Sequence, residues 1–271
     1  MLSILNSVSS LTAETALSST QANLQKTLTE LSTGLKINSG SDDAAGLSIA
    51  NGLQANISAL NQSSQNASDG VGLLQTADGA LSQVTTLLNR AVTLATEASN
   101  GGLSTSQATA LDTEYQSILT EIGNIGTTTN FNGTAIFGTT AAVFTSDGTT
   151  GGSGTTSTAI GALTTAALGL TGTDLTSTAD AQTALTDITA AISTVAANRG
   201  SIGAAVNQLT ATSNVENTEV TNLTSAENNI QNADIGQTVA QMTQYSVLEQ
   251  TGMAALSQSN QAQQSVLKLL Q

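Results

Sequence analysis

The longest regular pattern in the chain lies between Ala44 and Ala98, where apolar residues recur at alternating steps of three and four. This average spacing of 3.5 residues is typical of a coiled-coil seam. The seam positions are Ala50, Leu53, Ile57, Leu60, Ser64, Ala67, Val71, Leu74, Asp78, Leu81, Thr85, Leu88, Val92 and Ala95. A helix of this length would extend roughly 80 Å, more than one face of a compact domain. We therefore predict a rod that packs along other rods.

A matching seam follows in the second half of the chain. Its positions are Leu185, Ile188, Ile192, Val195, Arg199, Ile202, Val206, Leu209, Ser213, Glu216, Val220, Leu223, Glu227 and Ile230. A hairpin region separates the two seams, so we expect antiparallel helices. Arg199 should be either a snorkelling or a paired charge at an interface. A shorter helix that can complete the bundle is marked by Leu111, Tyr115, Ile118, Ile122 and Ile125.

Between the two long helices the helical period stops. The sequence Phe131-Asn132-Gly133-Thr134 predicts a β-hairpin around an Asn-Gly turn. The segment from Thr145 to Thr158 is rich in glycine, serine and threonine, which predicts an exposed loop. A phosphate-binding loop is excluded because the lysine of that motif is missing. The predicted fold class is mainly α: a long antiparallel helical bundle or coiled coil with a small β-hairpin region and a short Gly/Ser/Thr-rich loop.

Weaker amphipathic stripes occupy the two ends of the chain. A leucine stripe near the start is predicted to stop at Gly34, and a last helix is predicted from Ile235. Ser41, Asp42 and Asp43 precede the first long helix and should cap its N-terminus. A calcium loop is the competing interpretation of this acidic pair, although the spaced oxygen ligands of an EF-hand are absent. Both terminal stripes are short, so we expect the two ends to be disordered in the monomer and helical after assembly.

Composition and charge exclude several function classes. The chain of 271 residues has no cysteine and no histidine, and 19 acidic against 5 basic residues give a formal net charge of -14. This charge argues against nucleic acid and anionic lipid as partners. Membrane insertion is not expected, because no run of apolar residues is long enough to span a bilayer. We predict that the chain is not an enzyme and needs no cofactor. A metal site built from Asp78, Glu216 and Glu227 would lack the Glu-x-x-His pairs of bundle metal sites, so none is expected.

Several long stretches resemble one family. STGLKINSGSDDAAGLSIANGL and NQSSQNASDGVGLLQTADGALSQV are similar to the N-terminal region of bacterial flagellins. NRGSIGAAVNQL, AENNIQNADIG and ALSQSNQAQQSVLKLLQ are similar to the C-terminal region, and TNFNGTAIF resembles the flagellin β-hairpin motif. The resemblance covers about residues 1–140 and 180–271 and leaves only the middle unmatched.

The resemblance implies a structural subunit that self-assembles into the extracellular filament of the bacterial flagellum and serves swimming motility. The implied parts are the inner-tube helix with its connector (1–40), the first part of the bundle (41–140), a short variable exposed segment (141–178), the second part of the bundle (179–233) and the last inner-tube helix (234–271). Implied partners are further copies in a homopolymer, the flagellar export machinery, and cap and junction proteins. The first twenty residues lack the features of a secretory signal peptide, so we expect export without a cleaved leader. The alternative is a related hook–filament junction protein.

The resemblance also implies one candidate functional patch. In many flagellins an arginine, a leucine one turn further and a glutamate on the next helix contact an innate immune receptor, and Arg90, Leu94 and Glu114 occupy the matching places. Residues 91–93 are uncharged here, where strongly recognised members carry more charge. The alternative interpretation, which we favour as the primary role, is packing between subunits.

Overall fold

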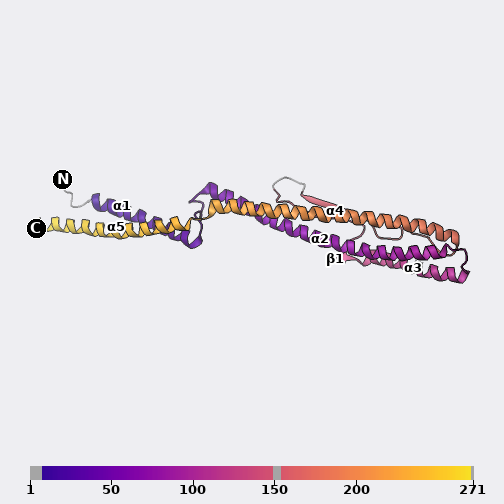
Figure 1. Ribbon diagram of the computed structural model, residues 1–271. Helices are drawn as coiled ribbons and strands as arrows, with labels where there is room; N and C mark the ends of the chain where they lie inside the picture. The colour runs from indigo at the N-terminus through magenta and orange to yellow at the C-terminus, as the bar shows by residue number, and fades with distance from the viewer. Residues whose placement is uncertain (1–7, 149–153, 270–271) are drawn as a thin grey trace. The chain divides into compact units, whose positions relative to one another are not determined.

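The computed structural model describes residues 8–148 and 154–269, which form five helices and four short strands (Figure 1). The helices are α1 (Val8–Thr33), α2 (Ala44–Ala98), α3 (Thr105–Thr128), α4 (Thr178–Gln231) and α5 (Ile235–Leu269). The strands are β1 (Asn130–Phe131), β2 (Thr134–Ala135), β3 (Thr139–Phe144) and β4 (Thr155–Ile160). The mainly helical fold class is confirmed. The extreme ends of the predicted terminal helices and the centre of the predicted loop lie outside the described residues.

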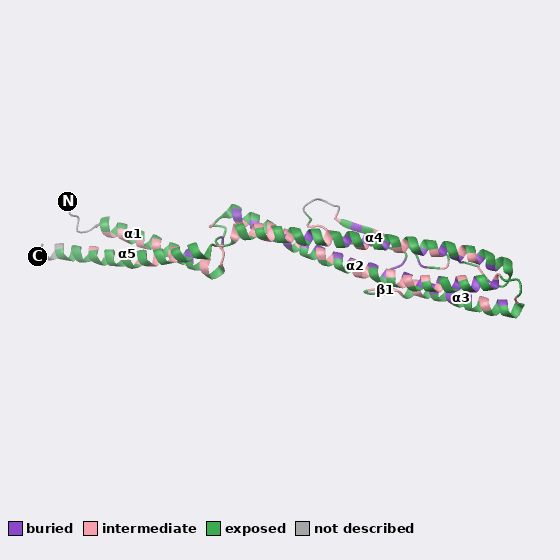
Figure 2. Cartoon of the chain, viewed as in Figure 1, coloured by how far each residue is buried: buried purple, intermediate pink, exposed green. Residues whose placement is uncertain are grey.

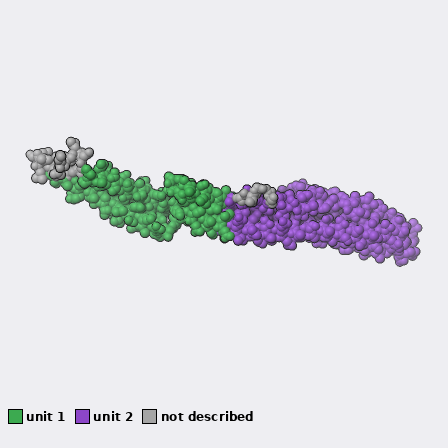
Figure 3. All heavy atoms as spheres, turned by 90° about the horizontal axis from the view of Figure 1, so that it is seen from above, with its two compact units in different colours: residues 1–55, 222–271 green, residues 56–221 purple. Residues whose placement is uncertain are grey.

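The chain divides into two compact units, coloured separately in Figure 3. Unit 1 comprises Met1–Ala55 and Asn222–Gln271, and unit 2 comprises Asn56–Thr221. The two long helices contribute to both units, since α2 and α4 each contain a unit boundary.

Unit 2 is a helical bundle in which α2, α3 and α4 share one apolar core (Figures 1 and 2). The Ser64 hydroxyl of α2 lies 2.9 Å from the Ser213 hydroxyl of α4, and further along α2 Asp78 lies 2.8 Å from Arg199. Residue numbers therefore rise along one helix as they fall along the other, which confirms the antiparallel arrangement. The largest fully buried helical side chains are Leu74, Leu81, Leu88, Leu94, Tyr115, Ile122, Ile188 and Ile202.

The three polar positions of the α2 seam each have a partner. Ser64 pairs with a serine of α4, and the Thr85 hydroxyl donates to the carbonyl oxygen of Leu81 at 2.8 Å. Arg199 donates to both carboxylate oxygens of Asp78, at 2.8 and 3.2 Å, so the paired-charge interpretation is confirmed. The side chains of this ion pair are 37% and 40% exposed, so it contributes no more than about 1 kcal/mol to stability. The seam therefore accepts these polar residues without leaving them unsatisfied.

The predicted β-hairpin is present. β1 pairs with β2 in an antiparallel register in which Phe131 is opposite Thr134. Asn132 has a φ of 49° and Gly133 a φ of 78°, as a two-residue type I′ turn requires. Asparagine and glycine tolerate positive φ better than other residues, which is why this dipeptide determines the turn.

The prediction that Thr145–Thr158 is wholly an exposed loop is wrong for its last residues. β4 begins at Thr155 and pairs with β3 in antiparallel register, from Thr139 opposite Ile160 to Phe144 opposite Thr155. Thr156, within the predicted loop, is buried. Threonine is β-branched and favours strands once a neighbouring strand is available, which composition alone does not reveal.

The expectation that 141–178 is exposed throughout is also wrong. After β4 the chain follows an irregular path in which Leu163, Leu168, Leu170 and Leu175 are buried against the core of unit 2. The Tyr115 hydroxyl of α3 lies 2.6 Å from that of Thr173, and Asp112 accepts the Leu175 N–H at 2.9 Å. These leucines follow no helical or strand period, so their burial could not be predicted from spacing.

Two glycines of α3 should respond oppositely to alanine. A Cβ on Gly126 would lie 1.9 Å from the carbonyl oxygen of Leu163, whereas Gly123 has no atom within 4 Å of that position. Because the obstruction is backbone, we expect Gly126→Ala to lower the free energy of unfolding by about 1–3 kcal/mol. Gly123→Ala should raise it by about 0.5–1 kcal/mol through helix propensity.

Urea unfolding followed by far-ultraviolet circular dichroism measures both variants. An equal effect of the two substitutions would contradict the close approach of residue 163 to α3.

Candidate assembly surface

In unit 1 the connector between α1 and α2 is hydrogen-bonded to the connector between α4 and α5. α1 stops at Gly34, as predicted, where φ is 74° and the N–H donates to the carbonyl oxygen of Glu30 at 2.8 Å. The Lys36 N–H donates to Gln231 at 2.7 Å, and the Ala233 N–H donates to Gly34 at 2.9 Å. These backbone bonds join two segments that are almost 200 residues apart in the sequence.

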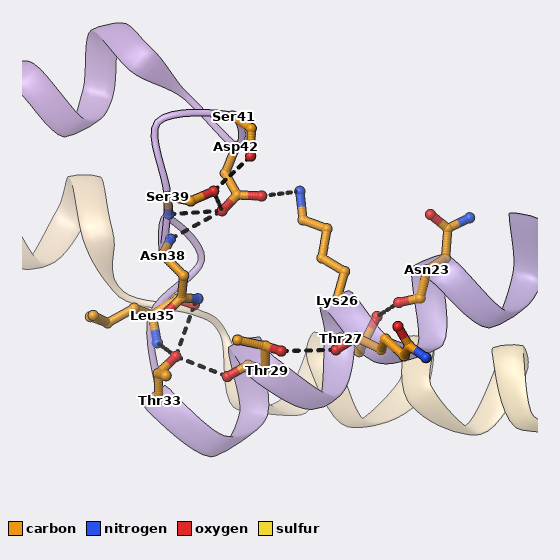
Figure 4. A network of polar contacts seen from close by, with 11 residues as sticks. Asn23, Lys26, Thr27, Thr29, Thr33, Leu35, Asn38, Ser39, Ser41 and Asp42 are labelled. Atoms are coloured by element: carbon orange, nitrogen blue, oxygen red, sulfur yellow. Dashed lines mark hydrogen bonds and ion pairs between the residues drawn. The ribbon is translucent and has the colours of Figure 1, made fainter.

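Asp42 organises the first connector (Figure 4). One carboxylate oxygen accepts the N–H groups of Asn38 and Ser39 at 3.2 and 3.0 Å, and the other lies 2.9 Å from the Lys26 ammonium. The predicted capping role falls to Asp43, whose carboxylate accepts the Gly46 N–H at 2.9 Å. Asp42 instead ties the connector to α1, so the two neighbouring carboxylates have different structural roles.

The connector should therefore loosen in acid. The Lys26 ammonium and the Ser39 hydroxyl lower the pKa of Asp42 from 3.8 to about 2. A carboxyl group whose pKa is lower in the folded state stabilises the fold above its unfolded pKa, and this contribution disappears as pH falls through the folded value. We expect the contribution to be complete above about pH 5 and absent below about pH 2.

Hydrogen exchange at the amides of Asn38 and Ser39 measures this effect in the assembled protein, where α1 is expected to be helical. Asp42→Asn should accelerate their exchange at pH 6 relative to the parent chain. Asp69→Asn, on the exposed surface of α2 in unit 2, is the control and should leave these amides unchanged. Equal protection of the connector in the parent chain and in Asp42→Asn at pH 6 would contradict the role assigned to this carboxylate.

α1 and α5 pack side by side in antiparallel orientation (Figure 1). The Gln21 amide donates to Glu249 at 3.2 Å, and the hydroxyls of Ser10 and Ser259 lie 2.9 Å apart. Near the middle of the pair, a Cβ on Gly252 would be only 3.3 Å from a methyl group of Leu17. The terminal helices thus pair with each other.

This pair of helices buries little of its apolar surface. Among the described residues of unit 1, only Ile37 and Ala50 are fully buried apolar residues, accompanied by buried Thr27 and Thr238. Unit 2, in contrast, contains the whole apolar core cluster. The hydrophobic stabilisation of unit 1 by its own residues is therefore small.

Large apolar side chains remain exposed instead. Of those in the described residues, all except Phe144 and Val215 belong to unit 1. We call this set the terminal apolar surface; it consists of Val8, Leu11, Leu28, Ile49, Ile235, Val239, Val247, Leu248 and Met253. Figure 2 shows the corresponding exposed stretches along α1 and α5. Several exposed aliphatic side chains on one helix pair indicate a surface that another chain covers.

The residues of the candidate receptor patch lie in different environments. Arg90 of α2 donates to Glu114 of α3 at 2.7 Å; this hydrogen-bonded ion pair raises the pKa of Arg90 and lowers the pKa of Glu114. Their side chains are 56% and 46% exposed. Leu94 is 1% exposed and belongs to the core of unit 2. The structure therefore brings two of the three residues together at the surface and places the leucine beneath it.

The three seam carboxylates do not converge on one site. Asp78 pairs with Arg199, and Glu216 accepts the Ser63 hydroxyl. Glu227 accepts both hydrogen bonds of the Gln54 amide, at 2.8 and 3.0 Å, when the amide nitrogen faces the carboxylate. No group of three acidic side chains in the described parts of the chain could hold a metal ion. The near-complete burial of Glu216 was not predicted. Periodicity places a residue on one face of a helix, but it does not show how closely other helices cover that residue.

None of the helices in the described ranges is long and apolar enough to cross a membrane.

Two family models match the chain. The model of the bacterial flagellin N-terminal helical region matches residues 4–142, and that of the bacterial flagellin C-terminal helical region matches residues 185–270. The two matches include the helices together with β1, β2 and most of β3, and they leave out β4 and the irregular segment that follows it.

Individual relatives agree with these matches. A flagellin of Halalkalibacterium halodurans is 36% identical over 249 residues, which are 91% of each chain. Flagellin B of Vibrio cholerae is 40% identical over 111 residues, which cover 41% of this chain but only 30% of that protein. Phase 1 flagellin of Salmonella naestved is 39% identical over 127 residues, or 47% of this chain and 25% of that one. Among solved structures, a Bacillus cereus flagellin has 31% identity and a TM-score of 0.49, with 56% of this chain and 88% of that chain covered.

Proposed function

Because the chain belongs to the bacterial flagellin family, we propose that it is the structural subunit of an extracellular flagellar filament built from copies of itself and used for motility. The observation that carries this proposal is the terminal apolar surface, whose side chains have no cover in the single chain. Packing of α1 and α5 against the same helices of other copies would remove these side chains from water. The alternative function is that of a hook–filament junction protein related to flagellin. None of the matches reported above and no structural feature favours it.

The roles of the chain's parts follow from this assignment. We propose that residues 1–40 and 234–271 form the inner tube and that the bundle segments 41–140 and 179–233 form the outer tube. The partners beyond further copies would be the export machinery and the cap and junction proteins. As for the receptor patch, Arg90 and Glu114 are accessible in the monomer, so we propose that any receptor contact at this patch involves these two side chains. Leu94 is unavailable for it.

The test of filament formation uses salt. Each subunit has a formal net charge of -14, so repulsion between copies should oppose assembly. The Debye length falls from about 30 Å at 0.01 M to about 10 Å at 0.1 M salt, and sulfate also strengthens apolar burial. We therefore expect the critical concentration for polymerisation to fall as either salt is added. Light scattering measures it, and electron microscopy should show long filaments. Short rings or no polymer under all conditions would refute the filament assignment.

We also expect the terminal helices to be ordered by assembly. Unit 1 buries few apolar side chains of its own, and isolated helices with weak apolar stripes are marginal in water. Hydrogen exchange of the dilute monomer should show rapid exchange in α1 and α5 and protection in unit 2, while filaments should protect both. Full protection of α1 and α5 in the monomer would contradict this prediction.

A further inference from the structure

Glu216 of α4 is almost completely buried, but only one of its carboxylate oxygens has a partner. The residue is 4% exposed, and Oε1 accepts the Ser63 hydroxyl of α2 at 2.5 Å. Oε2 has no hydrogen-bond partner, and in the described residues it is the only buried side-chain nitrogen or oxygen atom of which this is true. Burying part of a carboxylate without a partner is unfavourable, so the position indicates a group that the single chain does not supply.

Glu216 is one of the residues that line a groove of about 500 Å³ in unit 2, but its Oε2 has less than 1 Å² of exposed area, so a group that enters the groove reaches this oxygen only after the side chain turns. The apolar side chains of the lining are Leu60, Ala211 and Val215, and Glu219 lies one helical turn beyond Glu216 on the same helix. The remaining lining residues are polar: Thr145, Ser146, Asp147, Gln208 and Thr212. Apolar walls beside carboxylates suit a cation carried on an aliphatic stem, because the stem can contact the walls while the charge reaches the carboxylate. A metal ion fits less well, since no three acidic groups in the described chain are arranged to hold one.

The chain itself contains a cation of this kind. Its basic residues are Lys26, Lys36, Arg90, Arg199 and Lys268. Lys26, Arg90 and Arg199 form ion pairs within the chain, with Asp42, Glu114 and Asp78 respectively. Of the basic side chains that the structure describes, only Lys36 has no ion pair, and it is exposed on the connector between α1 and α2.

We propose that, in the assembled filament, the groove at Glu216 of one copy binds the Lys36 ammonium of a second copy. The inference rests on the proposed filament function. Copies with a formal net charge of -14 repel one another, so a contact between opposite charges offsets part of this repulsion and fixes the register of neighbouring subunits. The pairing also matches the unpaired buried oxygen of the groove with the unpaired lysine of the connector.

Disulfide formation between copies tests the contact directly, because the chain has no cysteine of its own. Subunits with Lys36→Cys are mixed with an equal amount of subunits with Glu219→Cys, polymerised and oxidised. We expect a covalent dimer of the two variants in filaments and not in dilute monomer. The control replaces Glu219→Cys with Thr189→Cys, an exposed position on the same helix that does not line the groove.

If filaments form normally but residue 219 cross-links no more strongly than residue 189, the inference is overturned. The filament function would remain intact. Failure of the parent chain to polymerise in any salt would instead overturn the proposed function.

A double-mutant cycle tests the energetic coupling. Glu216→Gln and Lys36→Met should each raise the critical concentration several-fold, and the double variant should resemble the single variants because the second change removes nothing further. Urea unfolding of each monomer separates damage to the fold from damage to the contact. If the double variant raised the critical concentration by the product of the two single factors, the two residues would act independently and the inference would be overturned.

Discussion

Leu81→Asp is expected to unfold the helical bundle of unit 2. Leu81 is 1% exposed in a core to which α2, α3 and α4 all contribute. The described ion pairs provide no cation for an aspartate at this position, since Arg199 already pairs with Asp78. The substitution removes a buried aliphatic side chain and places a carboxylate in an apolar environment. Each effect is unfavourable, and together they should cost more than about 4 kcal/mol. This is a large part of the roughly 5–15 kcal/mol by which a typical domain is stable.

The measurement is the urea unfolding transition followed by circular dichroism, with filament yield as a second readout. Gln83→Asp is the matched control, because residue 83 is exposed two positions further along the same helix and the change in charge is the same. It should shift the transition by less than about 0.5 kcal/mol. Leu223→Asp, at a half-buried position of the second seam, should have an intermediate effect. Similar midpoints for Leu81→Asp and Gln83→Asp would show that the seam is not a dry core.

The second large effect is expected on assembly and not on folding. Val247 and Leu248 of α5 are 53% and 44% exposed and belong to the terminal apolar surface. Covering such half-exposed side chains in the filament contributes about 1 kcal/mol each, from about 25 cal/mol per Å² of apolar area. Val247→Ser combined with Leu248→Ser should therefore raise the critical concentration about 30-fold, at about 1.4 kcal/mol for each factor of ten. Unfolding of unit 2 should not change.

Critical concentrations by light scattering and unfolding by circular dichroism measure the two parts of this prediction. The control is Thr243→Ser with Gln244→Ser, which alters two neighbouring exposed residues of α5 without removing a large apolar side chain. If the double variant at 247 and 248 assembled as readily as this control, the terminal apolar surface would not be the subunit contact.

The candidate functional residues were only partly predictable. The resemblance placed Arg90 and Glu114 on neighbouring helices as candidate residues, but it did not predict the ion pair that joins them at 2.7 Å. Leu94 lies one turn from Arg90 and therefore close to the same face of α2, yet it is buried because the neighbouring helices cover it. Spacing along one helix does not show which residues the other helices cover.

The sequence by itself determined the helices, the first hairpin and the family. The 3.5-residue seams, the Asn-Gly turn and the stop at Gly34 depend on residues close together in the chain, so local rules of spacing and backbone conformation are sufficient. The acidic charge follows from composition alone. Only the tertiary structure decided the burial of the irregular segment around Leu170, the pairing of β3 with β4, and the half-satisfied carboxylate of Glu216. Each of these depends on neighbours that are far away in the sequence, because burial and hydrogen-bond satisfaction are properties of the packed chain and not of its local period.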